Sequence, residues 1–198
     1  TKSTGTTIKN SKFTNNHALD GGAVSAFKSL SIENSVFENN TAMYARDEFG
    51  NWKDVASGIN DPIGGGALAL GAESETEIAT IAGTVFKNNK SGLNGGAIGT
   101  RLARVVGKDG AYTTGHNANS AKLDIAATFE DNFAVRSGGA IYNSFYTDNG
   151  LDKGDGVTVT GIFDDNKAGY RGGAIYNDGD LDYNKKGAVM TVNNATFT

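Results

Sequence analysis

The sequence contains no cysteine, one proline, one tryptophan and two histidines in 198 residues. The absence of cysteine excludes a disulfide framework and thiol catalysis, and it removes the commonest ligands of structural zinc. The two histidines, His17 and His116, fall in unrelated stretches of the chain. Neither a histidine metal pair nor a Ser/His/Asp arrangement is therefore supported.

Long apolar runs and clusters of one charge are absent as well. No run is long enough to span a bilayer and no signal peptide is recognisable, so we expect a segment that does not itself cross a membrane. The formal net charge of −4 and the pI near 5.2 argue against a nucleic-acid-binding surface. Glycine is abundant, at 28 residues, but a single proline excludes collagen, and 38% hydrophobic residues are too many for a disordered chain.

Two short motifs recur in a fixed order along the chain. One is a phenylalanine followed three residues later by asparagine, and the other is Gly-Gly-Ala followed by Ile, Leu or Val. The first motif supplies Phe13, Phe37, Phe86, Phe129, Phe163 and Phe197 with Asn16, Asn40, Asn89, Asn132 and Asn166. Such self-similarity marks a repeat architecture, and the last copy is cut off by residue 198. We therefore interpret residues 1–198 as a single domain that is one piece of a longer protein.

Each repeat carries three short β segments, which predicts an all-β, single-stranded parallel β-helix of about six rungs. In four copies an apolar residue precedes the phenylalanine by five positions, an odd separation that would place the two on opposite faces of a straight strand. The chain must therefore bend between them. We expect that bend at Asn10, Asn34, Gly83 and Asn193 or Asn194, residue types that tolerate left-handed backbone.

One repeat cannot close a core alone, so each rung should bury its inward side chains against its neighbours. We expect the six phenylalanines to form an interior ladder. A second interior ladder should comprise Val24, Leu68, Ile98, Ile141 and Ile175. We predict that the asparagine column supports the turns, either by amides stacked along the column or by amides that cap the turn backbone.

Four insertions interrupt the repeats, at residues 43–63, 101–120, 144–156 and 178–187. Loops that project from a rigid scaffold are where recognition usually lies. The first insertion contains Tyr44, Phe49 and Trp52. These aromatic side chains could form a binding platform for a sugar or a protein, or they could fold back over the flank of the solenoid.

Several acidic residues are candidates for a cation site. Alignment of the repeats places Asp165 over Asp131 and Asp164 over Glu130, and these four carboxylates could bind a cation or form the acid pair of a polysaccharide-cleaving enzyme. The column of Asp131 and Asp165 reads Asn15, Asn39 and Asn88 in earlier copies, which favours tolerated surface variation. Another acidic stretch, at Asp178, Asp180 and Asp182, resembles the start of a calcium loop but lacks the distal glutamate. We expect no cofactor, with calcium as the alternative.

The paired motifs resemble the repeats of the polymorphic outer-membrane proteins of chlamydiae and, more broadly, the autotransporter passenger domains of Gram-negative bacteria. The resemblance covers nearly the whole chain apart from the insertions. It implies a right-handed parallel β-helix, export to the bacterial surface, and adhesion to host or neighbouring cells. The motifs are structural signatures and carry no catalytic residues.

The sequence thus favours a non-enzymatic surface adhesin, a rigid stalk whose loops bind a host or bacterial receptor or a glycan. A β-helix that binds or cleaves extended polysaccharides is the alternative, since Arg136 and Arg171 before Gly-Gly-Ala could form an arginine clamp. A third interpretation is an extracellular filament subunit that self-associates.

Overall fold

The computed structural model describes most of the chain. The described ranges are 5–26, 29–42, 45–46, 52–53, 64–72, 78–102, 104–106, 112–114, 122–144, 146–147, 156–178 and 186–198. All regular structure in these ranges is β-strand, and no described segment forms a helix able to span a membrane.

Most strands belong to three stacked sheets whose strands pair in parallel. Sheet A contains β1 (Thr6–Lys9), β2 (Lys12–Thr14), β5 (Leu30–Glu33), β6 (Val36–Glu38), β11 (Ile78–Lys87), β16 (Lys122–Glu130), β20 (Gly156–Asp164) and β24 (Met190–Phe197). Sheet B contains β3 (His17–Ala18), β7 (Thr41–Ala42), β12 (Lys90–Ser91), β17 (Phe133–Ala134) and β21 (Lys167–Ala168). Sheet C contains β4 (Val24–Ala26), β10 (Leu68–Ala72), β13 (Ile98–Leu102), β18 (Ile141–Asn143) and β22 (Ile175–Asn177).

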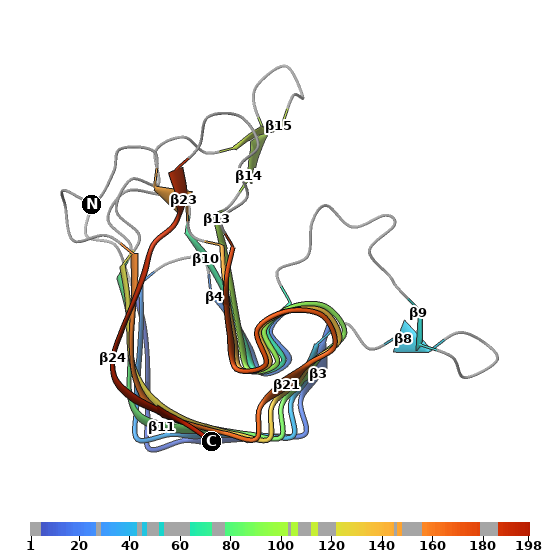
Figure 1. The fold of residues 1–198 in the computed structure, drawn as a ribbon, viewed down its shortest axis with the longest axis vertical. Helices are drawn as coiled ribbons and strands as arrows, with labels where there is room; N and C mark the ends of the chain where they lie inside the picture. Colours follow the sequence, from blue (N-terminus) through green and yellow to red (C-terminus); the bar gives the residue numbers. More distant parts are fainter. Residues whose placement is uncertain are drawn as a thin grey trace.

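The chain passes through these sheets in the order A, B, C and then repeats, which is the parallel β-helix that the motifs predict (Figure 1). In Figure 1 it descends on the left, crosses the bottom and rises on the right, and later rungs lie nearer the viewer. The coil is therefore right-handed. Sheet A contains strands from six successive rungs, in agreement with the expected number.

The phenylalanines form the predicted interior ladder. Neighbouring rings are stacked with centroids 4.7–5.1 Å apart and planes within 13° of each other. The four inner rings are at most 1% exposed, whereas Phe13 is half-buried and Phe197 is 51% exposed. The second ladder is confirmed too, because Leu68, Ile98 and Ile141 pair in register and are fully buried.

The bend before each phenylalanine lies where the sequence places it. Asn10, Asn34, Gly83 and Asn194 have positive φ angles of 47–58°, so the uncertain fourth position is resolved as Asn194. Strands β16 and β20 have one residue fewer here, and the pairing register of β11 with β16 shifts between Ala82 and Thr84. The bend allows an odd spacing to place both apolar residues inside.

The two glycines of Gly-Gly-Ala are required for different reasons. The first glycine has positive φ in every rung, 69° at Gly138 for example, and other residues adopt this conformation only with strain. A Cβ on the second glycine, Gly139, would lie 1.8 Å from the carbonyl oxygen of Gly173 in the next rung. Successive rungs thus approach too closely at this corner for any side chain.

The structure adds elements that the sequence did not reveal. Sheet B occupies the stretch between the asparagine and the glycines, where we expected only a turn. The insertions also carry antiparallel pairs: β8 (Ala45–Arg46) with β9 (Trp52–Lys53), β14 (Arg104–Val106) with β15 (Tyr112–Thr114), and β19 (Tyr146–Thr147) with β23 (Lys186–Ala188).

Candidate functional site

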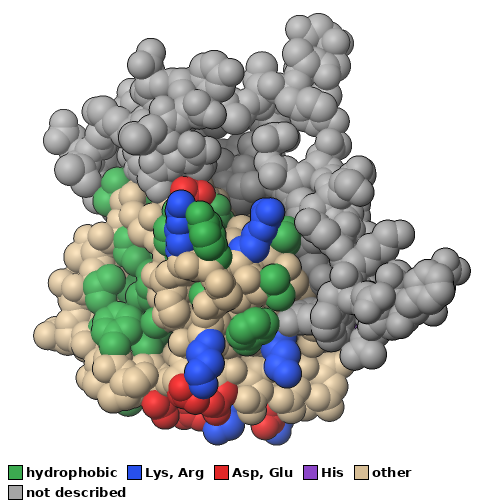
Figure 2. Space-filling view, turned by 45° about the vertical axis from the view of Figure 1, so that its right-hand side comes forward, with side chains coloured by type: hydrophobic (Ala, Val, Ile, Leu, Met, Phe, Trp, Pro, Cys, Tyr) green, Lys and Arg blue, Asp and Glu red, His purple; other side chains and the backbone are tan. Residues whose placement is uncertain are grey.

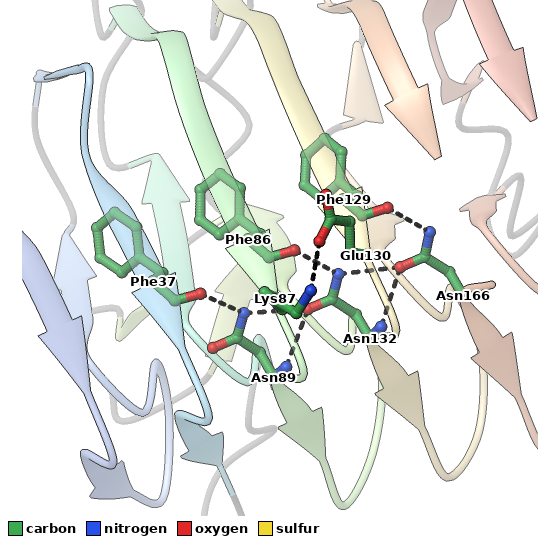
Figure 3. Close-up of polar contacts among 8 residues, drawn as sticks. All are labelled: Phe37, Phe86, Lys87, Asn89, Phe129, Glu130, Asn132 and Asn166. Carbon is green, nitrogen blue, oxygen red and sulfur yellow. Dashed lines mark hydrogen bonds and ion pairs between the residues drawn. The ribbon is translucent and has the colours of Figure 1, made fainter. Parts of the chain in front are cut away.

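The asparagine column lies at the corner between sheets A and B and runs through five rungs. The Nδ2 of each of the first four asparagines donates to the Oδ1 of the next asparagine along the coil, at 2.9–3.0 Å. From Asn40 onward, the same Nδ2 also donates to the phenylalanine carbonyl of the preceding rung (Figure 3). The two alternatives that we considered, stacked amides and capped backbone, are therefore both realised.

The inner asparagines have no hydrogen-bonding capacity left for a ligand. The Oδ1 of Asn89 accepts from both the backbone N–H and the Nδ2 of Asn40, and its two Nδ2 hydrogens go to Phe37 and Asn132. Asn40, Asn89 and Asn132 are at most 1% exposed. A buried amide with two donors and two acceptors satisfied stabilises the corner, since an unpaired one would be costly.

The stacked aspartates lie immediately before this column, at a position where every rung has left-handed backbone. Asp131 and Asp165 have φ angles of 53° and 48°, and Asn15, Asn39 and Asn88 have 52–58°. Asparagine and aspartate are the non-glycine residues that most readily adopt this conformation. The interchange of Asn and Asp in this column, which we interpreted as surface variation, therefore has a backbone cause.

Lysine and carboxylate side chains form ion pairs at this edge of sheet A. Lys87 Nζ lies 2.7 Å from Glu130, Lys12 Nζ lies 2.8 Å from Glu38, and Lys167 Nζ lies 2.8 Å from Asp165. The hydrogen bond to Glu130 raises the pKa of Lys87, and that to Asp165 raises the pKa of Lys167. Figure 2 shows acidic and basic side chains mixed at the lower edge of the described surface.

Three acidic candidates and all three aromatic candidates lie in or beside the insertions. The carboxylate of Asp178 accepts a hydrogen bond from the Tyr142 hydroxyl, and Asp180 and Asp182 lie outside the described residues. No group of three His, Asp or Glu side chains able to hold a metal ion occurs among the described residues.

The aromatic platform stays a prediction. Tyr44 and Phe49 lie outside the described residues, and for Trp52 only the backbone is described, as the first residue of β9 opposite Arg46. His17 is exposed in β3, opposite Thr41, and His116 lies outside the described residues.

A second polar cluster, which we call the Arg171 cluster, consists of Tyr142, Tyr170, Arg171, Tyr176 and Asp178. Arg171 donates from Nη1 to the Tyr176 hydroxyl (3.0 Å) and from Nη2 to the Tyr170 hydroxyl (3.1 Å). Its Cζ lies 4.6 Å from the Tyr170 ring centroid, within cation–π range. The hydrogen bond to Tyr176 raises the pKa of Arg171, so the guanidinium is charged at any physiological pH.

Sequence analysis missed this cluster although it singled out Arg171. The neighbouring rung has Ser137 at the position of Arg171, and the two residues form a β-bridge. Arg136 precedes that position by one residue, so the two arginines do not stack as a clamp. The repeated Ile-Tyr-Asn of β18 and β22 was the available signal, because parallel register places Tyr142 beside Tyr176, with ring centroids 5.9 Å apart.

The stacked corners and ladders define the chain as a parallel β-helical repeat protein. Three segments, residues 83–101, 126–144 and 160–178, match the family model of the Chlamydia polymorphic membrane protein (Chlamydia_PMP) repeat. These three segments are therefore similar to the repeats of this membrane-protein family, as the two motifs indicated. Each matched segment extends from the bend before the phenylalanine to the strand after Gly-Gly-Ala. Neither the curated proteins nor the solved structures contain a match to the chain.

Proposed function

We propose that this chain is a segment of a surface-exposed passenger of a bacterial outer membrane, a rigid and non-enzymatic stalk that presents loops for adhesion. Its partners would be a receptor or glycan on a host cell or a neighbouring bacterium. The matched repeats support surface exposure, since their family is one of membrane proteins. The observation that carries the proposal is the asparagine ladder, in which the repeated polar chemistry is used for the scaffold itself.

The carboxylates of the inner rungs support a non-enzymatic role. A glycosidase needs one acid and one base with access to substrate. Here Glu130 pairs with Lys87 and Asp165 with Lys167, and the backbone explains Asp131. One observation supports the alternative of a polysaccharide-binding or polysaccharide-cleaving β-helix. Glu130 and Asp164 are paired in parallel register, so two carboxylate residues lie at the same position of adjacent rungs.

A cell-binding assay tests the adhesive role. Beads coated with the folded chain should bind host epithelial cells or homologous bacteria, and beads coated with chain unfolded by Gly139→Ala should not. Antibodies against the chain should label intact bacteria. Absence of binding by the folded chain would overturn the proposal.

Two further measurements address the alternatives. Release of new reducing ends from a polysaccharide panel, abolished in Asp131→Asn or Asp165→Asn, would favour the enzyme. A molar mass that rises with concentration in sedimentation equilibrium would favour the filament subunit. We expect neither result, and we expect no change in unfolding temperature on addition of calcium.

A further inference from the structure

The Arg171 cluster combines features that the other charged groups of the described rungs lack. Its cation is held by phenols instead of by a carboxylate, because both hydrogen bonds of Arg171 go to tyrosine hydroxyls. The five described ion pairs all use lysine, and neither Arg171 nor Arg136 has a carboxylate partner among the described residues. Among the described residues, the positive charge of Arg171 is therefore held in place without a neutralising carboxylate.

A second arginine lies in the preceding rung. The backbone N–H of Tyr170 donates to the carbonyl of Arg136 at 2.8 Å, which places Arg136 one rung back at the register position of Tyr170. Both Arg136 and Arg171 are exposed. Adjacent rungs are about 4.8 Å apart, so the backbones of the two arginines lie close together, and no carboxylate of the described residues pairs with either side chain.

The guanidinium of Arg171 is oriented but not saturated. Two of its five N–H groups are used by the tyrosines, and the other three have no hydrogen-bond partner among the described residues. A guanidinium offers carboxylate or sulfate oxygens two parallel hydrogen bonds, and one that is already fixed in position loses little conformational entropy on binding.

The aromatic rings supply the second half of a binding surface. Tyr170 is 70% exposed, the largest exposed fraction among the large hydrophobic side chains of the described residues. Tyr176 is half-buried and stacks on Tyr142, whose hydroxyl is bonded to Asp178. An exposed tyrosine has an apolar face and a polar tip, a combination that suits the mixed apolar and hydroxyl surface of a sugar ring.

We propose that Tyr170, Arg171 and Tyr176, with Arg136 at the rim, bind an acidic glycan. The sugar ring packs on Tyr170, and its carboxylate or sulfate group is bound by Arg171. Two arginines on a chain of net charge −4 suit a ligand with isolated negative charges, whereas the dense charge of a nucleic acid would be repelled. This assignment rests on the proposed adhesive function and gives it a ligand class.

Titration of the 198-residue chain with defined oligosaccharides tests the site. The probes are an oligogalacturonate, which carries carboxylates, a heparin-derived oligosaccharide, which carries sulfates, and neutral maltohexaose. We expect binding of at least one acidic probe at low ionic strength and at least tenfold weaker binding of maltohexaose. Comparison of the two acidic probes identifies the anionic group.

Three variants assign the binding to named side chains. Arg171→Gln should weaken binding of the acidic probe at least tenfold, and Tyr170→Ala should weaken this binding several-fold. Tyr170→Phe should retain most of the affinity. Lys122→Gln removes an exposed cation elsewhere on sheet A and should leave the affinity within twofold. All three side chains are exposed, so thermal unfolding should confirm that each of the four variants is folded.

The proposal would be overturned by equal binding of acidic and neutral probes, by unchanged affinity in Arg171→Gln, or by an oligoglutamate peptide that binds as tightly as the glycan. The cell assay separates this site from the adhesive role. If Arg171→Gln loses the glycan but still binds cells as the parent does, adhesion stands and the Arg171 cluster is not its site. If neither the parent chain nor any variant binds cells, but the parent chain binds the acidic glycan in the titration, the adhesive role is contradicted and the glycan site is supported.

Discussion

The inner and outer rungs carry the same motifs, but their side chains lie in different environments. Phe129 is fully buried between two stacked rings, whereas Phe197, which has a ring on one side, is 51% exposed. A Cβ on Gly139 would collide with the next rung, yet a Cβ on Gly173 would meet nothing closer than 3.4 Å. Equivalent residues therefore differ in importance because each rung is completed by its neighbours, as expected for a solenoid.

The largest difference between inner and outer rungs should appear at the second glycine of Gly-Gly-Ala. Gly139→Ala places a methyl group 1.8 Å from the Gly173 carbonyl oxygen, and two backbones must separate to admit it. We expect loss of cooperative folding, measured by circular dichroism and thermal unfolding. Gly173→Ala is the matched control and should change the unfolding free energy by less than about 1 kcal/mol. Equal effects of the two changes would contradict the close contact between rungs.

The phenylalanine ladder gives the next largest expected difference. Phe86→Ala removes a fully buried ring that stacks on Phe37 and Phe129, and it should lower the unfolding free energy by about 3–5 kcal/mol. Phe197→Ala removes a ring that is half in solvent and should cost about 1 kcal/mol. Chemical denaturation of both variants measures the two losses in unfolding free energy. A larger cost at Phe197 would reverse the comparison.

The asparagine ladder should show a smaller contrast in the same direction. Asn89→Ala leaves the buried backbone N–H of Asn40 without its acceptor and removes the donor to the Phe37 carbonyl. At 1–3 kcal/mol for each unsatisfied buried group, we expect a loss of about 2–4 kcal/mol in unfolding free energy. The half-buried Asn166 is the control, and Asn166→Ala should cost less because the side chain that is removed is already partly in contact with solvent, so water can enter the space that it leaves. Urea unfolding of both variants at one pH measures the two losses in unfolding free energy, and an equal or larger loss for Asn166→Ala would contradict the expected order.

The smallest effect concerns the ion pairs on the surface, outside both ladders. The hydrogen bond from Lys12, reinforced by its charge, lowers the pKa of Glu38. The associated stability is present above the unfolded-state pKa of about 4.3 and is lost as the pH falls through the lowered folded-state value. NMR titration of Glu38 should give a higher midpoint in Lys12→Gln than in the parent chain, with little change in unfolding temperature. An identical midpoint would show that the pair does not persist in solution.

The sequence predicted the ladders well because each depends on one residue type at a repeated position. Phe86 and Asn89 could be placed over Phe129 and Asn132 from the motif alone, and Asn10 was identified as a bend from an odd spacing. Sheet B escaped notice because two-residue strands such as Lys90–Ser91 are too short to show alternation. The roles of Gly138 and Gly139 could not be separated, since the first depends on a φ angle and the second on a neighbouring rung.

The candidate site was harder to predict because it does not repeat. The residues equivalent to Arg171 in the other rungs are Asp20, Gly64, Asn94 and Ser137, which share no pattern that would single out this position. The contact of Arg171 to Tyr176 joins residues on either side of the glycine turn, so it depends on how sharply the chain reverses there. The sequence instead suggested the stacked aspartates Asp131 and Asp165 as a site, although the left-handed backbone at their position explains why aspartate occurs there.

The asparagine ladder joins residues that lie 24, 49, 43 and 34 positions apart, with the same hydrogen bonds at each step. The register of one rung on the next therefore does not depend on the length of the loop between them. Surface loops on such a framework can be lengthened, shortened or exchanged without selection having to rebuild the core.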